Sequence, residues 1–336
     1  MPDTYPLGKL PPDYLDRLFS RYVPADERVI LGPGIGHDAA VISFGDRYLV
    51  AKTDPITFAA EEIGWYAVHV NANDVACTGA VPRWFLATLL LPQTGTDEAL
   101  VDDIFQQIAR TCDQLGIALV GGHTEITHGL DRPILAGFML GEVSPEKLVR
   151  PDGARPGDAL LITKGIAVEG TAIIAREKGD HLEGVDHRLV ERGRQFLYEP
   201  GISVVRDALL ATSAGDVHAM HDPTEGGLAT GLWELAEAAG VGLIVEEESI
   251  PILAETAAVC EALGLDPLGL IASGALLLAV ARDQADDITR ALKAEGIAAA
   301  TIGRIVTPEK GVVLSSGGGT QPLPRFDQDE ITRLYQ

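Results

Sequence analysis

The chain has little cysteine, few aromatic residues and a shortage of positive charge. It contains three cysteines among 336 residues, an aromatic share of 5%, and 26 Lys and Arg against 49 Asp and Glu, for a formal net charge of −23. Cys77, Cys112 and Cys260 form no CxxC pair, so neither a disulfide framework nor a thiolate zinc site is expected, and reduced thiols in a cytoplasm are the simpler interpretation. The acidic balance argues against binding to nucleic acid or to an anionic membrane, because both recruit Lys and Arg.

Long apolar runs are also missing. The chain has no stretch of about 18 uncharged apolar residues, which is the length that a membrane-spanning helix needs. Its first 15 residues have neither an apolar core nor a basic leader, so we expect no signal peptide. With 336 residues, 46% of them hydrophobic, the composition is typical of a globular protein with two domains, since single cores rarely exceed about 250–300 residues.

Alternating apolar runs and chain breakers predict a mixed α+β fold in both halves. A dense group of Pro and Gly within residues 150–165 marks the connection between the halves, and a short helix is expected at Tyr14–Tyr22. The expected division is an N-terminal arm at 1–30, a first domain at 31–150, a second domain at 151–325 and a tail at 326–336.

Sequence periodicity places the secondary structure within these domains. In the first domain we expect strands at Ala39–Ser43, Tyr48–Lys52, Trp84–Leu91, Ala118–Val120 and Ile134–Val143, and helices at Glu62–Cys77 and Asp97–Leu115, the second helix capped by Thr96 and closed by Gly116. In the second domain we expect strands at Ala159–Thr163, Gly242–Glu246 and Ala275–Val280, and helices at 168–178, Ser203–Thr212 and Leu228–Ala239.

Gly34, Gly36 and Asp38 belong to the segment GIGHDAAVI, which leads into a strand. Glycine lets backbone N–H groups approach phosphate oxygens, and a nearby aspartate can hold the accompanying metal. The alternative is a glycine-rich turn whose aspartate bonds its own backbone. The segment is neither a Walker A loop nor a GxGxxG fingerprint. Asp54, after the apolar run YLVAK, is either a carboxylate at a strand end that faces a cleft or a simple cap.

Asn71, Asn73 and Asp74 in NANDVACTGA form the sharpest signal in the chain. In a helix over 62–77, Asn71 and Asp74 are three residues apart and share a face. Polar groups on an otherwise apolar helix face need hydrogen-bond partners or a ligand. We favour a ligand, and an internally satisfied polar patch is the alternative.

The segment VGGHTEIT places the twin glycines Gly121 and Gly122 before His123, Thr124 and Glu125. We expect a loop after a buried strand, in which the glycines allow close approach of a ligand. His123 and Glu125 are candidates for a catalytic or phosphate contact, and the alternative for both is a hydrogen-bonded turn residue.

In the second half, Asp222 lies in HDPTEGG, a glycine turn at the start of a helix where an anion can bind. His218 and His221 are close in sequence, but no third soft ligand has suitable spacing, so zinc is not expected. Lys52 and Lys164 are the candidates to contact a γ-phosphate, with Lys164 also a catalytic candidate, and surface placement is the alternative for both.

In this order, the motifs resemble the aminoimidazole ribonucleotide synthetase (PurM-like) superfamily, and within it the HypE-like hydrogenase expression/formation proteins. The resemblance covers about residues 30–325 and rests on GIGHDAAVI, TDP, NANDVACTGA, GGHTE, RPDGARPGD, TKGIAVEG and DPTEGG. It implies a two-domain PurM-like fold whose N-terminal sheet pairs with a second subunit in a homodimer, with ATP and Mg²⁺ as cofactors. Carried over to this chain, it makes Asp38, Asp54, Asp74 and Asp222 magnesium ligands and places Gly34, Gly36, Asn71, Asn73, Gly121, Gly122 and Thr124 at the nucleotide.

Two departures from the family pattern shape the expected function. His123 stands where HypE-like proteins carry Asp, and no cysteine follows Cys260, so the terminal-cysteine thiocyanate step of HypE is not expected. The resemblance then implies ATP-dependent phosphorylation of an amide- or carboxyl-type oxygen on a small-molecule or protein-borne acceptor. The alternatives are a thiamine-monophosphate kinase-like phosphotransferase and a nucleotide-binding maturation scaffold without turnover.

Overall fold

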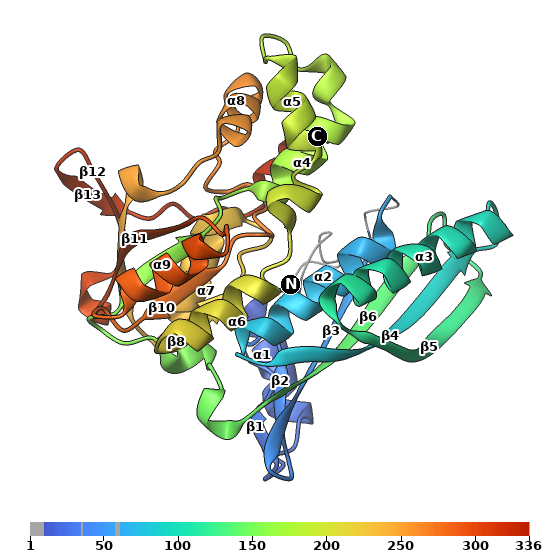
Figure 1. The fold of residues 1–336 in the computed structure, drawn as a ribbon, viewed down its shortest axis with the longest axis horizontal. Coiled ribbons are helices and arrows are strands. Elements are labelled where there is room, and N and C mark those ends of the chain that lie inside the picture. Colours follow the sequence, from blue (N-terminus) through green and yellow to red (C-terminus); the bar gives the residue numbers. More distant parts are fainter. Residues whose placement is uncertain (1–9, 35, 58–60, 336) are drawn as a thin grey trace.

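The structure is a computed structural model that describes residues 10–34, 36–57 and 61–335. Its N-terminal half contains a six-stranded sheet in the order β1-β2-β3-β6-β4-β5, antiparallel except for the parallel pair β4 and β5 (Figure 1). The strands are β1 (Val29–Leu31), β2 (Ala40–Phe44), β3 (Arg47–Ile56), β4 (Val81–Pro92), β5 (Ala118–Thr127) and β6 (Ile134–Val143). The helices are α1 (Pro12–Tyr22), α2 (Ile63–Cys77) and α3 (Glu98–Leu115).

Helices α2 and α3 lie side by side on one face of this sheet (Figure 1). Two glycines of β6 make this close packing possible. A Cβ on Gly137 would come within 2.5 Å of Asn71 Nδ2, and a Cβ on Gly141 would come within 2.4 Å of the Val75 side chain. Side chains of opposite parity along β6 therefore point to the other face of the sheet, where Phe138 is 41% exposed.

The C-terminal half is built on a seven-stranded sheet in the order β13-β12-β9-β11-β7-β10-β8. Its strands are β7 (Ala159–Thr163), β8 (Val217–His221), β9 (Gly242–Glu246), β10 (Leu277–Val280), β11 (Ala299–Val306), β12 (Val312–Ser316) and β13 (Gly319–Pro322). Its helices are α4 (Val168–Glu177), α5 (His187–Arg194), α6 (Val205–Ala214), α7 (Gly227–Ala239), α8 (Ala254–Leu263) and α9 (Ala285–Ala294).

The two faces of this second sheet belong to different cores. Leu161 and Leu278 share a core with α6 and α9, whereas Leu160 and Leu277 share a core with α7. Helices α4, α5 and α8 pack on one another at one end of the half (Figure 1). The expected mixed α+β fold is therefore confirmed.

Some helix and strand boundaries expected from the sequence agree with the structure, and others differ. The strands expected at Ile134–Val143, Ala159–Thr163 and Gly242–Glu246 have those limits in the structure. In contrast, β5 continues through the segment expected as a loop, so Gly121 to Glu125 are strand residues. The expected Thr96 cap of α3 is also wrong. Asp97 is the capping residue, because its side chain accepts a hydrogen bond from the Leu100 N–H at 2.9 Å.

Helix α2 joins the two halves. Every α2 residue except the half-buried Val70 is buried, and one continuous core includes α2, the first sheet, α6 and α9. A helix surrounded in this way must satisfy each of its polar side chains internally. Asn73 does so across the boundary, since its amide donates to Ile202 O and accepts from Val204 N–H, both at 2.8 Å.

His69, one turn earlier on α2, is buried against an aromatic ring. Its ring packs edge-on against Trp65 with a centroid distance of 4.1 Å. Burial lowers the pKa of His69 to about 3, so the imidazole is neutral at physiological pH. No helix of the described residues is both long enough and apolar enough to cross a membrane.

We predict that Asn73→Ala weakens the junction of the two halves. Removing the amide leaves one buried donor and one buried acceptor unpaired, which should lower the free energy of unfolding by about 1–3 kcal/mol. Chemical denaturation measures the change, with Gln106→Ala on the exposed side of α3 as the control. Equal free energies of unfolding for Asn73→Ala and the control would show that the two hydrogen bonds of Asn73 do not stabilise the junction.

Candidate functional site

The first part of the site lies between β3 and α2. Alternation along β3 turns Lys52 and Asp54 toward α2, where Asp74 is buried. The Lys52 ammonium lies 2.7 Å from Asp74 Oδ2 and 3.2 Å from Asp54 Oδ2. Asp54 and Asp74 therefore share one cation, although the two residues come from different elements of the sequence.

Asn71 fixes the backbone at this position. Its side-chain oxygen accepts a hydrogen bond from the Asp54 N–H at 2.8 Å, and its amide donates to Asp54 O at 3.2 Å and to Ala67 O at 2.8 Å. The amide thus pairs with the β3 backbone in the manner of a neighbouring strand. In this structure the polar side chain of Asn71 holds the carboxylate-bearing strand in place.

The second part of the site comes from the other half of the chain. His221, at the end of β8, lies with Nδ1 3.2 Å from Asp38 Oδ2 and Nε2 2.8 Å from Glu234 Oε2 of α7. Asp222 follows directly and is buried. Ligand atoms of Asp38, His221 and Asp222 lie within 4.8 Å of one another, close enough to share a metal ion.

Cys77 and a small cavity connect the two parts. The Cys77 thiol, at the end of α2, lies 3.4 Å from Asp222 Oδ1 and donates to it. Gly36, Asp38, Asp74 and Cys77 line the same cavity. All four aspartates expected from the sequence, Asp38, Asp54, Asp74 and Asp222, thus belong to one cluster at the junction of the halves.

The glycine segment reaches this junction because one of its residues has a left-handed backbone. Gly36 has a φ of 70°, and a Cβ there would lie 3.0 Å from the Cβ of Ala238 on α7. Glycine avoids both the backbone strain and the close contact. Gly34 lies just before it, where a Cβ would come within 2.8 Å of the His37 ring.

The charged groups of the cluster shift one another's pKa values. Burial raises the pKa of Asp74 well above its usual range, and Asp222 adds to the rise. Burial and Asp38 together raise the pKa of Asp222 to about 6. Burial alone would lower the pKa of His221, but its hydrogen bonds to Asp38 and Glu234 outweigh that effect and hold it well above its usual value. Negative charge therefore exceeds what Lys52 and His221 neutralise.

This donor set fits a magnesium ion. Carboxylate oxygens are the hard ligands that Mg²⁺ prefers, and the rise in the pKa of Asp74 and Asp222 shows that the buried cluster favours added positive charge. Asp38 and Asp222 would hold the ion, beside Asp74. When bound, it supplies the charge that neutralises a polyphosphate.

The expected ligands on β5 lie elsewhere in the chain. Gly121, Gly122, His123, Thr124 and Glu125 belong to the edge strand of the first sheet, and β4 and β6 separate that strand from β3. His123 Nε2 lies 3.0 Å from Glu125 Oε2, with both side chains exposed. Within one chain, this segment does not meet the aspartate cluster.

Lys164 is an internal lysine. Its ammonium donates to Gly201 O at 3.3 Å and to Ser203 O, and it lies 3.5 Å from Asp207 Oδ1. Its side chain is only 7% exposed. The alternative of surface placement is therefore wrong for Lys164, and in this structure the ammonium holds the 201–203 segment next to α6.

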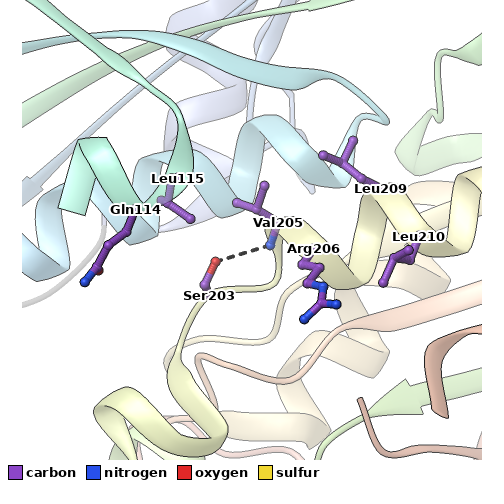
Figure 2. A pocket seen from close by; sticks show the side chains of 7 residues that line it. All are labelled: Gln114, Leu115, Ser203, Val205, Arg206, Leu209 and Leu210. Atoms are coloured by element: carbon purple, nitrogen blue, oxygen red, sulfur yellow. Dashed lines mark hydrogen bonds between the residues drawn. The ribbon is translucent and has the colours of Figure 1, made fainter. Parts of the chain in front are cut away.

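A separate pocket opens between the end of α3 and the start of α6 (Figure 2). Its lining residues are Gln114, Leu115, Ser203, Val205, Arg206, Leu209 and Leu210. The Val205 N–H donates to Ser203 Oγ at 3.4 Å, and Arg206 pairs with Glu295. The lining contains no carboxylate, so this pocket lacks the ligands of the aspartate cluster.

Sequence reasoning does not identify Glu234 as a site residue, and it considers His221 only as a zinc ligand, which it does not expect. His218, which the sequence places near His221, turns instead to Asp158 at 2.9 Å. Strand β8 has an irregular register opposite Ala279 and Val280, so simple alternation along the strand does not relate the side chains at positions 218 and 221. Glu234 lies 13 residues beyond His221 and reaches it only because α7 folds back over β8. No local sequence pattern separates the two histidines or marks Glu234.

Comparison with known proteins places this arrangement in a family. The family model of the AIR synthase related protein, N-terminal domain, matches residues 36–143, and that of the C-terminal domain matches residues 155–315. Carbamoyl dehydratase HypE of Rhizobium leguminosarum bv. viciae is 32% identical over 311 residues, covering 89% of this chain and 86% of that protein. A putative hydrogenase expression/formation protein of Methanocaldococcus jannaschii is 30% identical over 311 residues, covering 88% of each chain.

A solved structure agrees with these relatives. The hydrogenase maturation protein HypE in complex with ATP has a TM-score of 0.68 and 26% sequence identity, covering 96% of this chain and 99% of that chain. The two-domain PurM-like fold and the HypE-like resemblance expected from the motifs are confirmed.

The shifted pKa of Asp222 predicts a pH dependence of stability. Because folding raises this pKa from 3.8 to about 6, folding favours the protonated carboxyl. Its contribution is complete at a pH below about 4 and is lost as the pH rises through about 6. Relative to Asp222→Asn, the metal-free protein should therefore lose about 1–3 kcal/mol of unfolding free energy between about pH 4 and pH 7.5.

Thermal denaturation of both proteins across this pH range measures the effect. Added Mg²⁺ at neutral pH should restore the stability of the wild-type protein more than that of Asp222→Asn. A stability difference that stays constant with pH would show that Asp222 does not titrate in this range.

Proposed function

This chain belongs to the AIR synthase related family, and on that basis we propose that it is a Mg-ATP-dependent enzyme that activates an amide- or carboxyl-type oxygen by phosphorylation. The observation that carries the proposal is the convergence of Asp38, Asp54, Asp74 and Asp222 on one junction, where Asp74 and Asp222 are buried. A buried carboxylate is stabilised by a cation, and a metal-bound triphosphate brings one.

The residues around the junction support phosphoryl transfer. Asp38 and Asp222 would hold the metal, and Gly36 lies beside Asp38 in the small cavity that both residues line. Phosphoryl transfer depends mostly on positioning and on charge neutralisation, with little further chemistry required of side chains. The γ-phosphoryl group would pass from ATP to the acceptor oxygen, releasing ADP and turning that oxygen into a leaving group.

The acceptor oxygen belongs to another molecule in this proposal. All three cysteines, Cys77, Cys112 and Cys260, are buried, and the Cys77 thiol is engaged with Asp222. Burial raises the pKa of Cys77 well above its usual range, which keeps it a thiol. A small molecule or a protein segment that carries an amide or carboxyl group is therefore the proposed acceptor, as part of a hydrogenase-maturation type of reaction.

We predict that Mg-ATP binds to the purified protein and that removal of the metal weakens the binding by about tenfold or more, because the triphosphate then meets uncompensated carboxylates. Asp38→Asn and Asp222→Asn should weaken the binding of Mg-ATP to a similar degree. Isothermal titration calorimetry measures the affinity, with the exposed Asp283→Asn as the matched control.

Turnover is tested separately from binding. ADP release should rise when a candidate amide or carboxylate acceptor is added to the protein with Mg-ATP. A protein that binds Mg-ATP tightly and never releases ADP with any acceptor would contradict the enzyme and favour a nucleotide-binding scaffold.

We also infer that the protein works as a homodimer built on the uncovered face of the first sheet. On that face, Trp84 and Leu86 of β4 pair with Leu140 and Phe138 of β6. The adjoining edge strand β5 exposes Val120 at 53%, Leu119 at 40% and Ile126 at 61% of their surfaces. Within residues 10–34, 36–57 and 61–335, β5 is an edge strand, and an apolar face beside such an edge is a favourable surface for a second copy of the chain.

Such a dimer also gives a role to the segment that lies away from the aspartate cluster. Gly121, Gly122 and Thr124 are on β5, next to the uncovered face. They can serve as nucleotide ligands only if a second chain brings its own cluster to them, since β4 and β6 separate them from β3 in the same chain. The same holds for His123 and Glu125 as catalytic candidates.

We predict that Phe138→Lys converts the dimer into a monomer, because a buried lysine at the interface would be unpaired. Phe105→Lys on α3 is the matched control, since Phe105 and Phe138 are both 41% exposed in the single chain. Light scattering at micromolar concentration should report a dimer for the wild-type protein and the control. A monomeric wild-type protein would contradict the inference.

A further inference from the structure

Lys52 is a cation built into the centre of the aspartate cluster. Its side chain is 14% exposed, and its ammonium lies 2.7 Å from Asp74 Oδ2 and 3.2 Å from Asp54 Oδ2. Strand β3 delivers it there, because Lys52 and Asp54 are two residues apart and point to the same face. The lysine thus lies between two carboxylates that the family resemblance makes metal ligands.

Resting on the function proposed above, we propose that Lys52 is a tethered cation that replaces metal between Asp54 and Asp74 and directs the divalent ion to Asp38 and Asp222. Among the described residues, Asp54 and Asp74 both form their ion pair with Lys52. A divalent ion between these two carboxylates would have to displace the ammonium or lie against it.

Asp222 is in a different position. It is 3% exposed, and its recorded hydrogen bond is with the Cys77 thiol, which carries no positive charge. Its neighbour His221 divides its two hydrogen bonds between Asp38 and Glu234. Added positive charge is therefore worth most beside Asp222, a buried carboxylate that forms no ion pair with the part of the chain that the structure describes.

The rigidity of the lysine position supports the same assignment. Asn71 fixes the Asp54 backbone with two hydrogen bonds, and Asp74 sits on the fully packed helix α2. These contacts fix the backbone positions from which the two carboxylates reach Lys52. In this proposal Lys52 stays between them when the nucleotide binds and supplies a positive charge next to the phosphates.

The proposal is tested by counting bound Mn²⁺, used as a spin-active substitute for Mg²⁺, in the absence of nucleotide. Electron paramagnetic resonance of free Mn²⁺ should give a single site per chain for the wild-type protein. Lys52→Met, which removes the charge but keeps the length, should add a second site or tighten Mn²⁺ binding by about tenfold. Lys52→Arg keeps the charge and should behave like the wild-type protein, as should the exposed control Lys310→Met.

A pair of asparagine variants tests the same idea without altering the lysine, in case Lys52→Met does not fold. Asp54→Asn should change Mn²⁺ affinity by about twofold or less, whereas Asp222→Asn should weaken it by about tenfold or more. Equal Mn²⁺ binding by Lys52→Met and the wild-type protein, or loss of Mn²⁺ from Asp54→Asn, would overturn the assignment. Both measurements omit ATP, so they are independent of whether the proposed function holds.

Discussion

The burial of α2, in which every residue except Val70 is buried, is the constraint on which the rest of the structure depends. A helix covered by a sheet on one side and by α6 on another has no water to satisfy Asn71, Asn73 and Asp74. Each of these side chains must therefore find a partner on a different element. Asn71 binds the β3 backbone, Asn73 binds the 202–204 segment, and Asp74 meets Lys52. The same requirement that stabilises the helix also assembles the functional site.

The site belongs to neither half alone. Asp38, Asp54 and Asp74 come from the first half, and His221, Asp222 and Glu234 from the second, with contacts between Cys77 and Asp222 and between Asp38 and His221 crossing the boundary. A ligand that binds these carboxylates therefore touches both halves at once. Carboxylates from the two halves repel one another across the boundary, and a bound cation removes this repulsion. Cation binding therefore stabilises the arrangement in which the two halves are in contact.

Much of this arrangement follows from the sequence. The three-residue spacing of Asn71 and Asp74 on an apolar helix face predicts polar groups that need a ligand or internal partners, and the family resemblance carried by the motifs implies which aspartates gather. Contacts between residues that are far apart in the sequence do not follow from it. Asn73 and Ile202 are 129 residues apart, and Glu234 reaches His221 only through the packing of α7. Twin glycines predict a turn at 121–127, but this segment is part of the exposed strand β5. Gly122 packs its backbone against Ala87 of β4, where a Cβ would come within 1.9 Å of Ala87 O.

The most direct test of the account is a crystal structure of the protein with magnesium and a non-hydrolysable ATP analogue. The account predicts electron density for a metal ion bound to Asp38 and Asp222, with the triphosphate beside it and the Lys52 ammonium still between Asp54 and Asp74. Nucleotide bound away from these carboxylates, or bound without any metal contact to them, would contradict it.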